Sequence, residues 1–195
     1  MEKANLECLP QLTGTEKQVK WGSDIRDDFI RNISEAEALL QWWEKYSPEQ
    51  EETVARLRAN ADERKSGAVD EYNRFNGNVS AMAFEIGKRI RFLNAMVHME
   101  GRSPSRLSAK GQQLEDEFGD GILRYRPRAQ YRSERAYNSA VERRKKQKDA
   151  AEKIINAAKS YARQEQSASK WIDKREYTEK RKVKTSGNEI LWDAE

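Results

Sequence analysis

The apolar positions in the first third of the chain repeat with helical spacing. Four large side chains follow one another at intervals of four residues, which places them on one face of a helix: Trp21, Ile25, Phe29 and Ile33. The apolar face continues to Tyr46. The pattern therefore predicts a first helix over residues 15–46, which either breaks or runs on at Ser34.

Capping residues and prolines indicate where the helices begin. Before the first helix, Thr13 with Glu16 and Thr15 with Gln18 form two overlapping capping boxes. Ser47-Pro48 predicts a second helix start, because serine caps a helix and proline tolerates its first position. The buried side of that second helix is expected at Val54, Leu57 and Ala61.

The middle of the chain contains the most regular apolar stripe. We expect the second helix to end or kink at Ser66-Gly67, and Asn76-Gly77 to form a turn. A further helix, over about residues 79–100, carries one stripe made of Met82, Ile86, Ile90, Leu93 and Val97. Ser103-Pro104 opens a shorter helix that Gly119 ends. That helix carries Leu107, Leu114 and Phe118.

From Arg128 to Ser186 the chain has neither glycine nor proline and is rich in residues that favour helices. Its small and apolar residues form a narrow row: Tyr137, Val141, Ala151, Ile155, Ala158 and Ala162. Arg144 and Lys148 interrupt this row, so a regular coiled coil is only partly supported. One straight helix over 128–182 would extend roughly 80 Å, so we expect a break or a projecting end.

These patterns predict an all-α fold, a helical bundle or helical hairpins with one long basic C-terminal helix. The alternation in Ile122–Arg126 allows at most a minor, short β element. Hydrophobic and charged residues each make up 36% of the chain, enough for one modest core with much charged surface. We divide the chain into an N-terminal extension (1–14), a helical region with the main core (15–121), a basic segment and long helix that return to the core (122–184), and a tail (185–195).

The positive charge of the chain is concentrated in one segment. The net charge is +4, yet Ile122–Lys148 holds ten bases and two acids, a local charge of +8 on a body of −4. A basic patch on a mildly acidic body is typical of proteins that bind polyanions.

Tyrosines alternate with arginines in this basic segment. Arginine binds phosphates through two hydrogen bonds, and tyrosine stacks on unpaired bases. We therefore predict a nucleic-acid-binding segment made of Arg124, Tyr125, Arg126, Arg128, Tyr131, Arg132, Arg135, Arg143, Arg144, Lys145, Lys146 and Lys148. A secondary basic patch is predicted at Lys88, Arg89 and Arg91. The same charges could instead face an acidic protein surface or simply solvate the helix.

Residues for other chemistry are few. His98 and Cys8 are single residues of their type, and the single cysteine excludes an intramolecular disulfide and a cysteine-based zinc site. A catalytic triad or a histidine-based metal site would need partners for His98 that this chain lacks. The acidic clusters at 24–28, 49–52 and 115–117 are interpreted as solvated, and no phosphate-binding glycine motif is present. We expect a protein that is not an enzyme and has no catalytic residue, metal or cofactor; carboxylates with a metal are the enzymatic alternative.

The chain shows no apolar run of the roughly 18 residues that a membrane span needs. Its first residues lack the apolar stretch of a signal peptide. We therefore expect a cytoplasmic protein that does not contact a membrane.

Two short motifs carry a resemblance. Leu12–Trp21 (LTGTEKQVKW), followed by Asp24-Ile25-Arg26, resembles the opening of a group of small, uncharacterised bacterial and phage proteins that read "LTGSEKQ…WA…IR". Ser169–Arg175 is similar to their later "AKWWIDxR"-like segment, with one tryptophan missing. The resemblance implies that the first helix packs against the helix of Trp171. It also implies a phage or mobile-element origin, and it carries no catalytic residue.

Together, the charge and the resemblance favour a binding protein that engages nucleic acid or a nucleoprotein complex. A phage origin would imply action against host defence in the host cell cytoplasm, such as an anti-CRISPR-type inhibitor that holds a CRISPR effector with its guide RNA. The alternative is an oligomeric coiled-coil scaffold, such as a homodimer, or an adaptor that binds an acidic protein surface.

Overall fold

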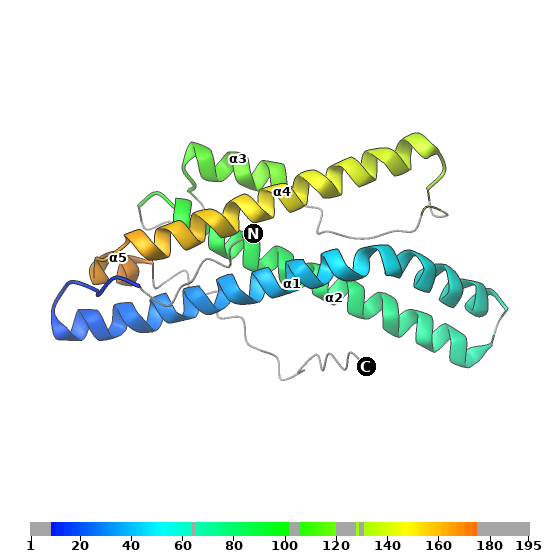
Figure 1. The fold of residues 1–195 in the computed structure, drawn as a ribbon, viewed down its shortest axis with the longest axis horizontal. Helices are drawn as coiled ribbons and strands as arrows, with labels where there is room; N and C mark the ends of the chain where they lie inside the picture. The colour runs from blue at the N-terminus through cyan, green and yellow to red at the C-terminus, as the bar shows by residue number, and fades with distance from the viewer. Residues whose placement is uncertain (1–8, 64, 102–105, 120–127, 129–130, 175–195) are drawn as a thin grey trace.

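The chain folds into long α-helices that pack along one another (Figure 1). The computed structural model describes residues 9–63, 65–101, 106–119, 128 and 131–174. The helices are α1 (Glu16–Asp62), α2 (Ser66–His98), α3 (Ala109–Phe118), α4 (Glu134–Gln164) and α5 (Ala168–Asp173). The all-α prediction is confirmed, because the described residues contain no strand and only two isolated bridges, Thr13 with Ser167 and Met99 with Leu107.

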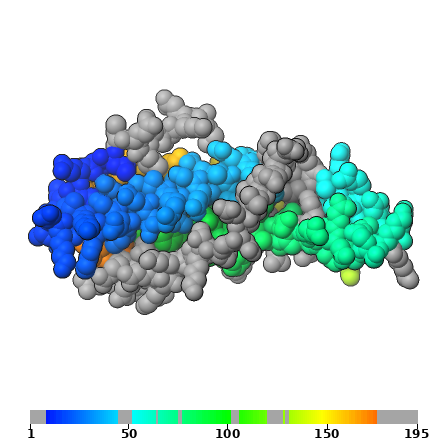
Figure 2. All heavy atoms as spheres, turned by 90° about the horizontal axis from the view of Figure 1, so that it is seen from below, coloured from blue at the N-terminus to red at the C-terminus, as the bar shows by residue number. Residues whose placement is uncertain are grey.

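Helices α1 and α2 form an antiparallel hairpin that runs along the whole molecule (Figure 1). With 47 residues, α1 is roughly 70 Å long at 1.5 Å per residue. Figure 2 shows α1 covering much of one face, with the cyan-to-green end of the hairpin forming one end of the molecule. The hairpin is thus the frame on which α4 and α5 lie.

The start of α1 confirms the second of the two predicted capping boxes. The backbone N–H of Gln18 donates to Thr15 Oγ1 at 3.4 Å, and the N–H of Thr15 donates to Gln18 Oε1 at 2.9 Å. Thr13 caps nothing. Its N–H and its hydroxyl both donate to the carbonyl of Gln166, at 2.8 and 3.2 Å. The first predicted box is therefore replaced by a contact with the far end of the chain.

Two predicted boundaries are wrong. Pro48 lies inside α1 and Asn76-Gly77 lies inside α2, where a helix start and a turn were expected. An interior proline costs about 3 kcal/mol in a helix. Leu40 and Val54, before and after it, are both buried, and α1 contacts α2 along the hairpin, so this packing outweighs the local cost. The boundary predicted at residues 66–67 is close to the observed one, because α1 ends at Asp62.

Four helices meet around Trp171 of α5, which is completely buried. Its ring lies 5.4 Å from that of Phe29 in α1 and 5.1 Å from that of Tyr161 in α4, measured between centroids. Phe92 of α2 lies 6.3 Å from Phe29. The packing of the first helix against the Trp171 helix, implied by the resemblance, is therefore confirmed.

The prediction that Trp21 is a core residue is wrong. Its side chain is 44% exposed, with Lys17 Nζ 5.5 Å from its ring centroid. The neighbouring Gly22 faces α5 instead, so close that a Cβ there would lie 3.0–3.2 Å from atoms of Ala168. Direct contact between the two helices thus requires the smallest residue, which turns the tryptophan outward.

The predicted break in the long C-terminal helix is confirmed at Glu165–Ser167, between α4 and α5. The indole of Trp171 donates to the carbonyl of Glu165 at 3.3 Å, and the N–H of Ala168 donates to the carbonyl of Thr13 at 3.1 Å. These bonds satisfy polar groups that the end of a helix leaves free.

Helix α3 is shorter than predicted. Ser108 caps it, its hydroxyl accepting from the N–H of Gly111 at 3.2 Å, so Leu107 precedes the helix instead of lying within it. Gly119 ends it with φ +67°, as expected. The predicted start at 103–104 and the extended piece at 122–126 lie outside the described residues, as does the tail.

Candidate nucleic-acid interface

The first turns of α4 project from the body of the protein. Residues 134–139 are all exposed except the half-buried Tyr137, and Ala140 is the first buried residue of the helix. Figure 1 shows this yellow end of α4 extending away from α1 and α2. A partner can therefore approach the N-terminal half of α4 from several sides.

Local contacts fix where α4 begins. The hydroxyl of Ser133 accepts from the N–H of Ala136 at 3.2 Å, as an N-cap does. The rings of Tyr131 and Tyr137 lie 5.6 Å apart, and Arg128 lies 5.8 Å from the ring of Tyr137. The two tyrosines predicted to stack on bases thus contact each other and steady the helix start.

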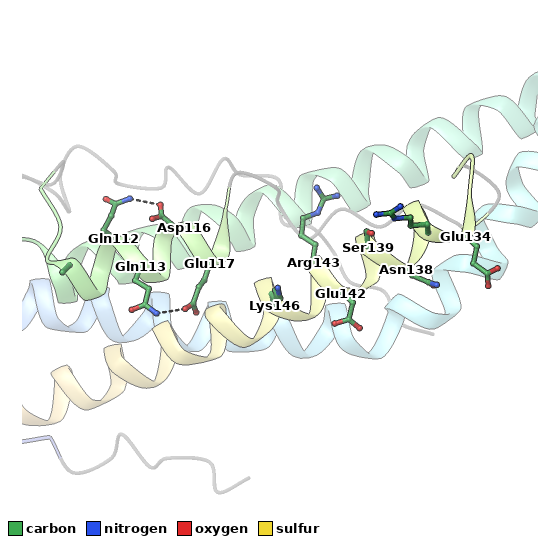
Figure 3. A pocket seen from close by; sticks show the side chains of 12 residues that line it. Gln112, Gln113, Asp116, Glu117, Glu134, Asn138, Ser139, Glu142, Arg143 and Lys146 are labelled. Carbon is green, nitrogen blue, oxygen red and sulfur yellow. Dashed lines mark hydrogen bonds between the residues drawn. The ribbon is translucent and has the colours of Figure 1, made fainter.

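Five of the predicted residues are exposed bases that form no ion pair within the described part of the chain. They are Arg132, Arg135, Arg143, Lys145 and Lys146, and we call them the basic face. Glu134, Glu142 and Asp149 are the acids nearest to them in sequence. Figure 3 shows Glu142 and Arg143 projecting from α4 in different directions. Among the described residues of the predicted segment, the basic face holds the exposed bases that form no ion pair within the fold.

Two predicted binding residues belong to the interior contacts of α4. Arg144 is only 9% exposed and lies on the same buried face as Ala140 and Gln147. Lys148 forms ion pairs with Glu44 of α1 and with Glu152, and its hydrogen bond to Glu44 raises its pKa above the usual value. The sequence offered a signal, since both residues interrupt the apolar row predicted for this helix. Arg124, Tyr125 and Arg126 lie outside the described residues.

The secondary basic patch is matched by carboxylates inside the fold. Arg89 is buried, and its guanidinium lies 2.8 Å from Glu35 of α1 and also pairs with Glu85. Lys88 lies 4.0 Å from Glu85. Arg91 lies 3.0 Å from Glu115 of α3 and donates to the carbonyl of Gly119 at the same distance. Arg89 and Arg91 thus connect α2 to its neighbours and Lys88 pairs within α2, so we leave all three out of the interface.

An open groove of about 1520 Å³ runs from α3 along the N-terminal half of α4 (Figure 3). Three members of the basic face line it from α4, Arg135, Arg143 and Lys146, beside the acids Glu134 and Glu142. At the α3 end, Gln112 donates to Asp116 and Gln113 donates to Glu117, each at 2.9 Å. The groove exceeds the roughly 300–1,000 Å³ of small-molecule pockets, which favours an extended partner.

The α3 residues of the groove were not predicted from the sequence. A polar outward face is common to most surface helices, so only the position of α3 beside α4 distinguishes it.

Within the described residues, no group of three or more histidine, cysteine or acidic side chains is arranged to hold a metal ion. Nor does any helix among them combine the length and apolar character that crossing a membrane requires. Comparisons of the chain with protein-family models, with curated proteins and with solved structures find no match. The resemblance to phage proteins thus stays a prediction.

Proposed function

We propose that this protein binds nucleic acid, alone or within a nucleoprotein complex, through the basic face of α4. The observation that carries the proposal is the set of five exposed bases without an ion-pair partner among the described residues. Their charge is available to phosphates, because no internal carboxylate compensates it.

Most of the binding free energy is expected from contacts with phosphates. Each phosphate that a lysine or arginine neutralises releases condensed counterions, which stabilises the complex at low salt. Arginine adds paired hydrogen bonds to phosphate oxygens. The projecting end of α4 offers these groups without rearranging the core, since residues 134–139 are mostly exposed already.

The test is a fluorescence anisotropy titration of RNA and DNA oligonucleotides at several salt concentrations. Replacing Arg135, Arg143 and Lys146 by alanine should weaken binding about tenfold or more and reduce the salt slope by about two for a single strand. A matched control replaces Arg56, Arg58 and Arg74, three exposed arginines of the hairpin, and should leave both values unchanged. Binding that is negligible at low salt, or that ignores salt, contradicts the proposal.

The coiled-coil alternative would use the N-terminal end of the apolar row, where Tyr137 and Val141 are half-buried. The rest of the row is covered within the chain itself, at Ala151, Ala158 and Ala162. A pull-down with and without nuclease tests the other alternative, an acidic protein partner. Loss of the partner after nuclease treatment supports a nucleic-acid component, as expected for an effector with its guide RNA, and retention favours the protein.

A further inference from the structure

A second pocket, of about 610 Å³, lies where the end of α2, α3 and the C-terminal half of α4 meet. Its volume is in the range of small-molecule sites. Its lining shares no residue with the groove described above: Val97, His98, Lys110, Leu114, Lys153, Asn156, Ala157, Ser160, Tyr161 and Gln164.

The lining has the chemistry of a site for an organic anion. Val97, Leu114 and Ala157 contribute apolar surface. Around it stand hydrogen-bonding side chains and two cations, and the described lining contains no carboxylate. The hydrogen-bonding side chains are Asn156, Ser160 and Gln164, and the cations are Lys110 and Lys153. Apolar surface with a few polar groups is the usual composition of a ligand pocket.

Two lysines, Lys110 and Lys153, line the pocket beside His98. Burial lowers the pKa of His98, and the charges of Lys110 and the nearby Lys174 lower it further. An anion in the pocket would offset the charge of these lysines.

Acids lie close to the pocket without lining it. Glu165 follows the lining residue Gln164, pairs with Lys170 at 3.1 Å, and acts electrostatically on Tyr161 of the lining. Glu117, on the groove side of α3, pairs with Lys153 at 3.0 Å. This ion pair is exposed, and such pairs contribute little to stability. A ligand phosphate can therefore compete with Glu117 for Lys153 at small cost.

We propose that this pocket binds a phosphate monoester of nucleotide size, with its phosphate at Lys110 and Lys153 and its ring over Val97 and Leu114. The proposal does not depend on the basic face, because the two sites share no residue. The phosphate has two sources, a free mononucleotide or the phosphorylated end of a nucleic-acid strand.

The experiment uses the single histidine of the chain as a reporter. Adenosine 5′-monophosphate, added to the whole protein, should shift the NMR signals of His98 and raise its pKa. Adenosine and inorganic phosphate should each bind more weakly, since each lacks one half of the recognised group. Unmoved His98 signals, or adenosine binding as tightly as its monophosphate, overturn the proposal.

Three single-residue variants test which side chains bind the phosphate. Lys110→Met should weaken binding of the monophosphate about tenfold, the loss of one charged hydrogen bond. Glu117→Gln should tighten binding, because it frees Lys153. Lys20→Met removes an exposed lysine of α1 and is the matched control, expected to match the wild type. An unchanged affinity in Lys110→Met contradicts the proposed site.

Oligonucleotides with a 5′-phosphate or a 5′-hydroxyl then distinguish the two sources. A strand that shifts His98 only when phosphorylated identifies the strand end as the ligand. A mononucleotide that binds while no oligonucleotide does identifies the free nucleotide, and in that case the pocket stands while the proposed function fails.

Discussion

The two halves of α4 use the same residue types in different ways. In the C-terminal half, Lys159 is 7% exposed and pairs with Glu37 of α1. In the N-terminal half, Lys146 is exposed and has no ion-pair partner among the described residues. Alanines fill the buried side of the C-terminal half, where α4 packs against α1 and α2. Charge therefore serves the fold at Lys159 and is left for a partner at Lys146.

A basic helix therefore has to be divided by the burial of its side chains before it is assigned a function. Substitutions of buried side chains, which dominate the C-terminal half, should reduce stability and leave intrinsic binding unchanged. Substitutions of the exposed bases in the N-terminal half should weaken binding and leave stability nearly unchanged, because exposed side chains contribute little to folding.

The largest expected effect concerns Trp171, on which the C-terminal half of α4 packs. Trp171→Ala should lower the free energy of unfolding by about 3–5 kcal/mol, because a completely buried indole leaves a cavity. Urea denaturation measures the change. Trp21→Ala, at a 44% exposed position, is the control and should cost about 1 kcal/mol or less. Equal losses in the two variants would contradict the packing described for α5.

Next in size is the effect of adding volume to the buried alanine row. Ala158→Leu should cost about 1–3 kcal/mol, since its site is completely covered and overpacking forces helices apart. Ser139→Leu makes the chain equally larger on the exposed side and should stay within about 0.5 kcal/mol. Thermal unfolding compares them, and a stabilised Ala158→Leu protein would show that the row is loosely packed.

The paired lysines compare the two halves directly. Lys159→Met should cost about 1–2 kcal/mol, because Glu37 loses the cation that it contacts, and its effect on oligonucleotide affinity should be slight. Lys146→Met should weaken oligonucleotide binding and leave the free energy of unfolding within about 0.5 kcal/mol. Denaturation and anisotropy are measured on both variants. The contrast fails if either variant changes both the free energy of unfolding and the oligonucleotide affinity.

A pH dependence is expected at the end of the core. Lys174 lies 4.1 Å from the ring of Tyr161, and burial lowers its pKa from 10.5 to about 8. Between these values the unfolded chain holds the proton more firmly than the folded one, so stability should rise with pH. Burial raises the pKa of Tyr161 above its usual 10.0, so stability should fall again at higher pH.

Lys174→Met separates these contributions. The rise above pH 8 should disappear in this variant, while the loss of stability above pH 10 should persist, because Tyr161 is unchanged. Denaturation midpoints measured from pH 7 to 11 provide the comparison. A rise that survives the substitution assigns it to another group.

Local signals in the sequence identified much of the fold. The Thr15 capping box and the stripe from Met82 to Leu93 were predicted, since each depends on residues within a few positions of one another. The helix start predicted at Pro48 and the turn predicted at Asn76-Gly77 were wrong because they too relied on neighbouring residues alone. Their cost is local, and it is outweighed by contacts between α1 and α2 that no short window of sequence contains.

The candidate site was only partly predictable. Composition located the basic segment but could not separate Lys148 from Lys146, because the carboxylate that pairs with Lys148 is Glu44, over a hundred positions earlier. The phosphate pocket was not predicted at all. His98, Lys110 and Lys153 come from three helices, so their grouping exists only in the folded chain.

The hydrogen bonds between Thr13 and Gln166 have a consequence for folding during synthesis. They close a loop of 153 positions, so the ribosome makes Gln166 long after Thr13. The hairpin of α1 and α2 can form before that, since its two helices are consecutive in the chain. The side of α1 that receives Trp171 must wait until α5 has emerged, and until then Phe29 lacks its contact with the indole. A chain interrupted before α5 would thus display part of its aromatic core to chaperones and proteases.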